Sequence, residues 1–254
     1  MRILLGIFSL LWKLYIALIF VVTAFIFYPL IAPQLYSEKG KKRAFRLFVV
    51  WSWVVRLLCF YFVDKKLNSP LPEAPYIIIA NHASYLDIFL MHSLLSKNRF
   101  LFLGKSEILS YPLIKTYFKR MNIPVYRSSA VKSARALVVA AKEVKKGWSL
   151  VIFPEGGIPD DDNPRMVPFK EGAFQLAKSL NVPIVPVTFT NNYRLFSDPS
   201  QIFGPARPGI SHVYIHPFIS AEEVKSLTKN ELSARCFDLV NGPLMECHPH
   251  LRQE

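Results

Sequence analysis

The sequence predicts an α/β protein, with a mixed, largely parallel sheet flanked by helices and an N-terminal two-helix membrane-embedded segment. Two long apolar runs occupy the N-terminal third, and the rest of the chain alternates short apolar runs with amphipathic stretches. The short runs are almost continuously apolar, which is typical of strands buried on both faces. With 254 residues, 52% hydrophobic and 19% charged, the chain can bury a sizeable core and is too apolar to be disordered.

We divide the chain into residues 1–66, a membrane-embedded helical pair with a basic connector, and residues 67–254, an α/β domain. In the first part, residues 14–32 carry no charge. As a helix this run would extend about 28 Å, close to the thickness of a bilayer core. The second run, residues 47–63, contains Arg56 near its middle.

Two membrane arrangements fit this pattern: a pair of full spans, or two helices that enter one leaflet. Basic residues lie before, between and after the runs, most densely in residues 37–46, and the positive-inside rule favours one face for all of them. Arg56 would cost about 2.5–3.5 kcal/mol at a bilayer centre, although an arginine can extend toward the headgroups. We favour the one-leaflet arrangement, in a membrane-associated protein whose α/β domain lies on the cytoplasmic face of the inner or plasma membrane.

The second part begins with a proline-rich linker at residues 69–75, which forbids a continuous helix. The apolar runs predict strands at residues 76–80, 100–103, 123–126, 150–153, 184–189 and 212–216. Helical spacing of apolar residues predicts helices at 86–96, 107–119, 131–146, 172–180 and 231–245.

The net charge of +13 predicts acidic partners, above all the anionic lipids of a membrane surface. Nucleic acid is not an expected partner, because the basic residues are dispersed and no nucleic-acid-binding module is present. Three cysteines cannot form a disulfide framework, which fits a reducing compartment. No set of residues has convincing metal-ligand spacing, so we predict no metal site.

The predicted catalytic residues are His82 and Asp87. His82 lies in the turn after the strand at 76–80, where a rigid element holds it, and Asp87 follows five residues later at the start of a helix. A carboxylate that binds one imidazole nitrogen leaves the other free to accept a proton from a hydroxyl. The alternative is structural: Ser84-x-x-Asp87 is also the pattern of a helix capping box. The two interpretations are compatible.

Two further turns follow buried strands and could bind a ligand. Glu155 and Gly156 belong to a Pro-Glu-Gly-Gly turn after the strand at 150–153, where glycine allows a ligand to approach the backbone. Arg127 follows the strand at 123–126, although a lone arginine is more often a solvated surface charge. No Gly-x-Ser-x-Gly elbow, Walker loop or Gly-x-Gly-x-x-Gly motif is present.

Four blocks in order resemble those of the glycerolipid acyltransferases, and most of all the bacterial 1-acyl-glycerol-3-phosphate (lysophosphatidate) acyltransferases. They are Asn81-His82 with Asp87, residues 123–127, residues 153–156 and residues 182–187. Lys105 and the Phe-Lys-x-Gly segment at 169–172 also lie where the family has similar residues. The resemblance is close over residues 76–189, and four blocks with this order and spacing are far more specific than one His-x-x-x-x-Asp.

The resemblance implies acyl transfer by the α/β domain to the free hydroxyl of 1-acyl-glycerol-3-phosphate, giving phosphatidate. His82, oriented by Asp87, would deprotonate the hydroxyl, which would attack the thioester of acyl-coenzyme A or of an acyl carrier protein. Glu155 and Gly156 would shape the acceptor site, Arg127 would bind the phosphate, and Lys105 would contribute to substrate binding. No tightly bound cofactor is implied, and direct transfer requires no nucleophilic residue.

The sequence departs from the family pattern in the third block, which usually continues with Thr-Arg. Here Gly157 and Ile158 occupy those positions, so a phosphate-contact candidate is missing. Arg165, Lys170 or Lys105 could substitute. Two alternative functions follow: acylation of a lysolipid without a phosphate, such as an acyl-amino-acid lipid, or membrane lipid binding without catalysis.

Overall fold

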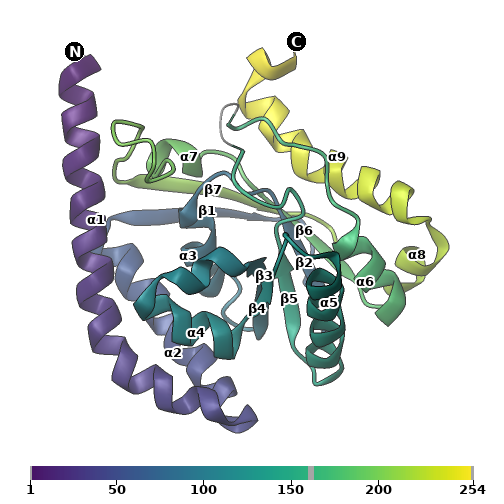
Figure 1. The fold of residues 1–254 in the computed structure, drawn as a ribbon. Helices are drawn as coiled ribbons and strands as arrows, with labels where there is room; N and C mark the ends of the chain where they lie inside the picture. Colours follow the sequence, from purple (N-terminus) through teal and green to yellow (C-terminus); the bar gives the residue numbers. More distant parts are fainter. Residues whose placement is uncertain (1, 160–162, 253–254) are drawn as a thin grey trace. The chain divides into compact units, whose positions relative to one another are not determined.

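The computed structural model describes residues 2–159 and 163–252 (Figure 1). Its strands are β1 (Tyr61–Leu67), β2 (Ile77–Ala80), β3 (Phe100–Lys105), β4 (Ile123–Val125), β5 (Ser149–Ile152), β6 (Ile184–Phe189) and β7 (Gly209–Ile215). They form a seven-stranded sheet in the order β1-β7-β6-β2-β5-β3-β4. Within this order, the neighbouring strands β6, β2, β5, β3 and β4 pair in parallel. Strands β6 and β7 pair antiparallel. The predicted mixed, largely parallel sheet is therefore confirmed.

The chain forms two compact units, which we describe separately. The first contains the chain as far as Asp64 together with Ala83–Lys97 and Asn191–His212. The second contains Lys65–His82, Asn98–Thr190 and the chain from Val213 onward.

The first unit is mainly helical. Its elements are α1 (Arg2–Ile31), the 3₁₀ helix η1 (Ala32–Tyr36), α2 (Glu38–Leu58), α3 (Tyr85–Leu94) and α7 (Asn192–Leu195). Ser37 starts α2, because its hydroxyl accepts a hydrogen bond from the Gly40 N–H at 3.0 Å. The sequence patterns predicted neither η1 nor α7, because each is only four or five residues long.

Helix α1 has one exposed and one buried face. Leu4, Leu11 and Leu18 recur every seven residues and are exposed, whereas Lys13 and Thr23 are buried. Of the described residues, only the stretch Ile3–Tyr36 is long and apolar enough to cross a membrane, judged by length and composition, and 22% of its most apolar window is buried. This helix indicates membrane association.

The predicted second membrane helix at residues 47–63 is not confirmed. Helix α2 ends at Leu58 and strand β1 begins at Tyr61, inside the predicted run. Arg56 is buried and donates from Nη1 to the Ser93 hydroxyl of α3 at 2.9 Å, so this part of α2 packs within the protein. The apolar run continues across the turn without Gly or Pro, and Phe60 instead adopts a φ of 51° to redirect the chain.

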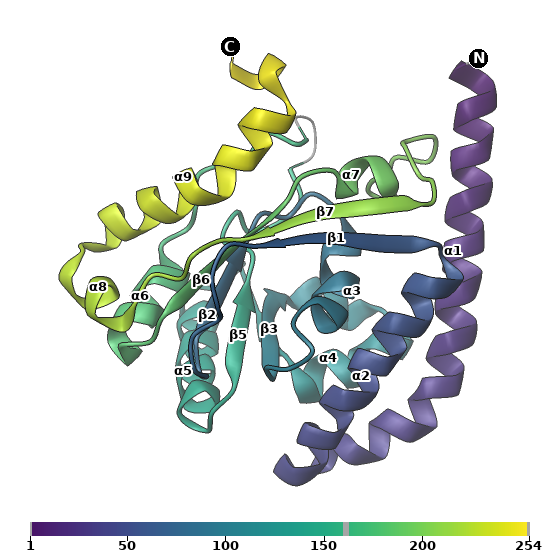
Figure 2. The ribbon, with the colours of Figure 1, turned by 180° about the vertical axis from the view of Figure 1, so that it is seen from behind.

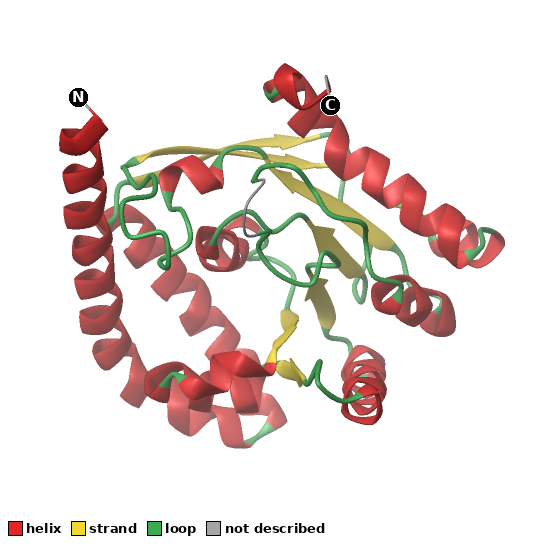
Figure 3. Ribbon diagram, turned by 45° about the horizontal axis from the view of Figure 1, so that its top comes forward, coloured by secondary structure: helices red, strands yellow, loops and turns green. Residues whose placement is uncertain are grey.

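The second unit carries the strands that position the site. Its helices are η2 (Ser106–Ser110), α4 (Pro112–Met121), α5 (Ala130–Lys145), α6 (Gly172–Leu180), α8 (Ala221–Ser226), α9 (Lys229–Cys247) and η3 (Pro249–Arg252). Figures 1 and 2 show α5, α6 and α9 on the same side of the sheet, and Figure 3 separates the strands from these helices by colour. Strand β2 lies at the centre of the sheet with all four residues buried, as its continuous apolar sequence predicts.

Candidate active site

The carboxyl ends of β2, β5, β3 and β4 lie in a row at one edge of the sheet, because these neighbouring strands are parallel. The register pairs Ile152 of β5 with Ile79 of β2 and with Leu103 of β3, and Lys105 of β3 with Val125 of β4. These ends, and the turns after them, carry His82, Glu155, Lys105 and Arg127. Ligands of α/β proteins bind at such an edge, so this row of second-unit residues is the candidate active site.

Three sets of contacts hold His82 in place: those of its neighbour Asn81, of its ring and of its backbone N–H. The Asn81 side chain joins the end of β2 to β6, accepting from Phe189 N–H at 2.8 Å and donating to its carbonyl at 2.9 Å. The His82 ring is half-buried and stacks on Phe153, with centroids 4.2 Å apart and planes 20° apart. The His82 backbone N–H donates to Glu155 at 2.7 Å. The imidazole is therefore fixed at the end of β2.

Glu155 has a structural role that the motif did not reveal. Glu155 is 6% exposed, and its carboxylate links two segments of backbone. One oxygen accepts the His82 N–H, and the other accepts the Val167 N–H at 3.1 Å. Because both oxygens face donors, only a carboxylate satisfies this arrangement.

The glycines of this turn are surrounded by cationic side chains. Gly156 has a φ of 87°, and a Cβ placed on it would lie 2.5 Å from Lys170 Nζ, so no other residue fits without displacing that amine. A Cβ on Gly157 would lie 2.7 Å from Lys105 Nζ and 3.8 Å from Arg127 Nη1. Lys105 and Arg127 therefore bring two positive charges to the same point.

The positive charges of Lys105 and Arg127 also affect the pKa of Glu107. Hydrogen bonding from its own backbone N–H holds the pKa of the exposed Glu107 carboxyl below its usual value, and Arg127 and Lys105 contribute to the same shift. The exposure of Arg127 agrees with its interpretation as a solvated side chain, and it is equally accessible to an anionic ligand.

Asp87 belongs to the first unit, where it is completely buried at the start of α3. Its Oδ2 accepts the N–H groups of Ala83 at 2.8 Å and Ser84 at 2.9 Å. The Ser84 hydroxyl in turn accepts the Leu86 N–H at 3.0 Å, so the predicted capping box is confirmed. Oδ1 accepts a hydrogen bond from the Asn192 side-chain amide at 2.7 Å.

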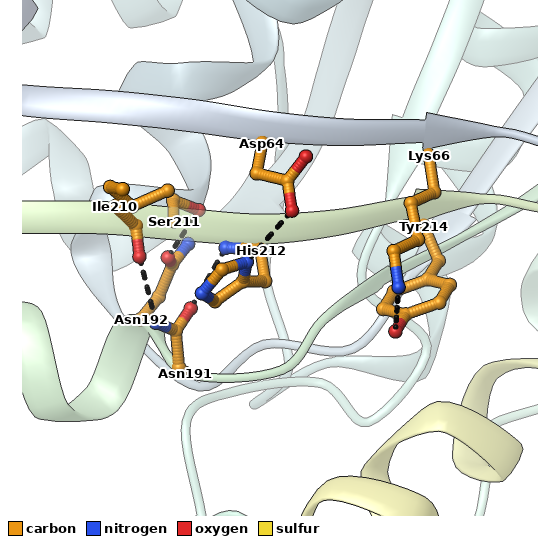
Figure 4. A network of polar contacts seen from close by, with 8 residues as sticks. All are labelled: Asp64, Lys66, Asn191, Asn192, Ile210, Ser211, His212 and Tyr214. Carbon is orange, nitrogen blue, oxygen red and sulfur yellow. Dashed lines mark hydrogen bonds and ion pairs between the residues drawn. The ribbon is translucent and has the colours of Figure 1, made fainter.

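Asn192 is itself fixed by a buried neighbour. The Ser211 hydroxyl donates to Asn192 Oδ1 at 2.6 Å (Figure 4). Ser211, Asn192 and Asp87 are all 0% exposed. Figure 4 also shows a second contact of this unit, an exposed pair in which His212 Nδ1 lies 3.1 Å from Asp64 Oδ2. Nothing near Asn192 or His212 in the chain indicates either of these partners.

Five of the six predicted site residues therefore lie in the second unit, and the sixth lies in the first unit. Four strand ends of the second unit carry His82, Glu155, Gly156, Lys105 and Arg127. The first unit holds Asp87. Sequence reasoning missed the contacts of Phe153 and Asn192, whereas Lys170 was identified as a substitute cation.

The chain matches the family model described as Acyltransferase over residues 63–190, half of its length. It is 32% identical over 218 residues to a "1-acyl-sn-glycerol-3-phosphate acyltransferase" of Saccharomyces cerevisiae, covering 81% of this chain and 67% of the relative. It is 31% identical over 179 residues to "1-acyl-sn-glycerol-3-phosphate acyltransferase BAT2, chloroplastic" of Brassica napus, covering 69% of this chain. The chain spans about half the length of that chloroplast relative.

The fold is similar to a solved structure, the 1-acyl-sn-glycerophosphate (LPA) acyltransferase PlsC from Thermotoga maritima. The TM-score is 0.76 at 23% sequence identity, and the match covers 100% of this chain and 99% of that one. The match to the family model and the similarity to the yeast relative both agree with the four sequence blocks. The chain therefore belongs to the glycerolipid acyltransferase family.

Proposed function

We propose that the protein transfers a fatty acyl group from an acyl thioester to the free hydroxyl of 1-acyl-glycerol-3-phosphate, giving phosphatidate. The observation that carries this proposal is the approach of Lys105 and Arg127 to one point beside Gly157. Two cations at the strand ends that continue the row from His82 suit an acceptor with a phosphate and a hydroxyl. The relatives of Saccharomyces cerevisiae and Brassica napus, both named 1-acyl-sn-glycerol-3-phosphate acyltransferases, support the same substrate.

In the proposed reaction, His82 is the general base. Its imidazole removes the proton from the lysolipid hydroxyl, and the hydroxyl oxygen attacks the thioester carbonyl to form a tetrahedral intermediate. The carbon–sulfur bond then breaks, and the departing sulfur takes the proton from the imidazolium. General-base assistance of this kind is worth about 10²–10⁴ in rate.

Asp87 would orient the imidazole and stabilise the imidazolium. Its support is the spacing of five residues from His82, and the hydrogen bonds that Asp87 accepts from Ala83 and Ser84 immediately after that histidine. The contact with Asn192 fixes the remaining oxygen. A capping carboxylate with this many donors has little freedom to rotate, which suits an orienting role.

The phosphate site is retained in this proposal, although Gly157 and Ile158 replace the family's Thr-Arg. Gly157 leaves room for the Lys105 amine, since a side chain there would collide with it. We infer that Lys105 supplies the positive charge that the missing arginine would supply, and that Arg127 completes the phosphate contact. Glu155 and Gly156 would shape the acceptor site by holding the turn.

The acyl donor would be acyl-coenzyme A or an acyl carrier protein thioester, and no tightly bound cofactor takes part in the proposed reaction. Both donors are acidic, which suits a chain with a net charge of +13.

We further propose that helix α1 embeds in one leaflet and that residues 67–254 form the acyltransferase domain on the cytoplasmic face. The support is the two-faced character of α1: an apolar stripe is exposed, while Ser9, Lys13 and Thr23 are buried on the other side. With its polar side chains turned into the protein, α1 can place its exposed apolar stripe among the acyl chains of one leaflet. Membrane lipids would then be both the partners and the substrates.

The test is a product analysis by mass spectrometry. Purified protein in lipid vesicles is given either donor and one of three acceptors: 1-acyl-glycerol-3-phosphate, a monoacylglycerol, or a lyso form of an acyl-amino-acid lipid. The proposal predicts phosphatidate as the main product. Equal rates with phosphate-free acceptors would contradict the phosphate assignment, and no consumption of either thioester would favour a non-catalytic lipid-binding protein.

A further inference from the structure

The first unit contains a groove that the proposed reaction does not use. It has a volume of about 980 Å³ and lies between the first turns of α1 and the segment 194–207. Its wall is mostly apolar, with Ile3, Phe8 and Phe203 among the lining residues, and it also contains Arg194 and Arg207. A groove with an apolar wall and two cations has the character of a site for an anionic amphiphile.

Polar contacts hold the segment against α1, so the groove is formed in advance of any ligand. The buried Lys13 amine of α1 donates to the Gln201 carbonyl at 2.6 Å and to the Ser197 hydroxyl at 2.8 Å. The Ser9 hydroxyl of the same helix accepts the Ala206 N–H at 3.3 Å. These contacts fix two stretches of the segment to one face of the helix.

Apolar packing completes the attachment, because the Phe203 ring lies against Gly6 of α1. A Cβ on Gly6 would be in ordinary contact with that ring, at 3.5 Å. Ile202 and Phe203 are nevertheless 56% and 66% exposed, an unusual state for two neighbouring large apolar residues in a turn. Large apolar side chains next to arginines are typical of segments that enter a membrane interface.

We propose that this groove binds an anionic phospholipid of the membrane, with an acyl chain against Ile3, Phe8 and Phe203 and the phosphate at Arg194 and Arg207. Both arginines are exposed, so each guanidinium can reach a headgroup without a change of fold. Ile3 and Phe8 also belong to the exposed apolar residues of α1, so the groove continues the surface that we assign to the membrane. The site would make attachment selective for anionic lipids.

Vesicle flotation of the purified full-length protein tests this proposal. Vesicles of phosphatidylcholine alone are compared with vesicles that contain phosphatidylglycerol, and the ratio of the two affinities is measured. In R194Q/R207Q we expect that ratio to fall on the order of tenfold, because each basic residue at an anionic surface contributes to binding. Native mass spectrometry should show loss of co-purified phosphatidylglycerol from the same variant.

The control is R135Q/K142Q, which removes the same charge from exposed positions on α5. We expect this control to retain most of the selectivity, and F203S to weaken binding to both kinds of vesicle. An unchanged ratio in R194Q/R207Q would overturn the proposal. An equal fall in R135Q/K142Q would also overturn it, since the preference would then reflect net charge alone.

Discussion

The side-chain amide of Asn192 donates to the Oδ1 atom of Asp87 at 2.7 Å, and both residues are completely buried. The pair joins the start of α3 to a residue more than a hundred positions later in the chain. Asp87 is thus held from three directions, by two backbone N–H groups and by Asn192. A carboxylate held in this way suits the orientation of a catalytic base.

We expect Asn192→Ala to lower kcat by about tenfold, equivalent to about 1.4 kcal/mol, without a large change in KM. The free energy of unfolding should also fall by about 1–3 kcal/mol, because a buried acceptor loses its donor. Ser211→Ala removes only the support of Asn192 and should have a smaller effect on both quantities. Loss of stability with unchanged kcat would show that Asn192 serves the fold alone.

Glu155→Gln should destabilise the protein, although it preserves the shape of the side chain. The amide group has one acceptor where Glu155 has two, so either the His82 or the Val167 N–H would face an NH₂ group. We expect a loss of about 1–3 kcal/mol in chemical denaturation, together with reduced activity. The matched control is Glu171→Gln on an exposed ion pair, where a change of less than about 0.5 kcal/mol is expected. Equal effects would contradict the proposed link.

Arg127→Ala should raise KM for 1-acyl-glycerol-3-phosphate by about tenfold and leave KM for the thioester unchanged. The reason is the loss of a charge-assisted contact to the phosphate, a contact worth about 1.5–3 kcal/mol. Arg135→Ala on α5 is the control and should change neither constant. An equal increase for both substrates would argue against phosphate binding by Arg127.

The buried His216 predicts a loss of stability in acid. It is 6% exposed, its Nε2 lies 2.8 Å from the Thr188 hydroxyl, and burial lowers its pKa from 6.5 to about 4. The unfolded chain therefore takes up a proton more readily than the folded chain between these pH values. Stability from this group is complete above about pH 6.5 and declines toward pH 4, by up to about 3 kcal/mol.

Denaturation curves at pH 7.5 and pH 4.5 measure this effect. His216→Gln removes the titrating group and should reduce the difference in stability between the two pH values. His250→Gln, at an exposed position, should leave the difference as in the wild type. A difference that is the same in all three proteins would contradict the assignment to His216.

Much of the sheet could be predicted because its strands are short, apolar and separated by clear turns. The strand at 184–189 was predicted at its observed bounds, and that at 76–80 within one residue. The placement of His82 and Glu155 at strand ends followed from the same pattern, since parallel neighbours end at one edge. Local patterning was therefore sufficient for the row of strand ends.

Other features depend on contacts distant in sequence and gave no local signal. Strand β1 could not be predicted, because its apolar residues continue the apolar run of α2. Only the positive φ of Phe60 separates the helix from the strand. Asn192 follows a strand as an ordinary polar residue, and nothing nearby indicates that it binds Asp87. Similarly, the need for a glycine at position 157 follows only from the position of the Lys105 amine, which is distant in the sequence.

The central claim is that the His82 imidazole is the catalytic base, and the rate of acyl transfer by His82→Ala tests it most directly. The backbone N–H that donates to Glu155 is retained in this variant, so the protein should fold, which a thermal melt can verify. We predict a loss of activity of about 10²–10⁴-fold with 1-acyl-glycerol-3-phosphate and a thioester donor. A folded variant that transfers acyl groups at close to the wild-type rate would contradict the account.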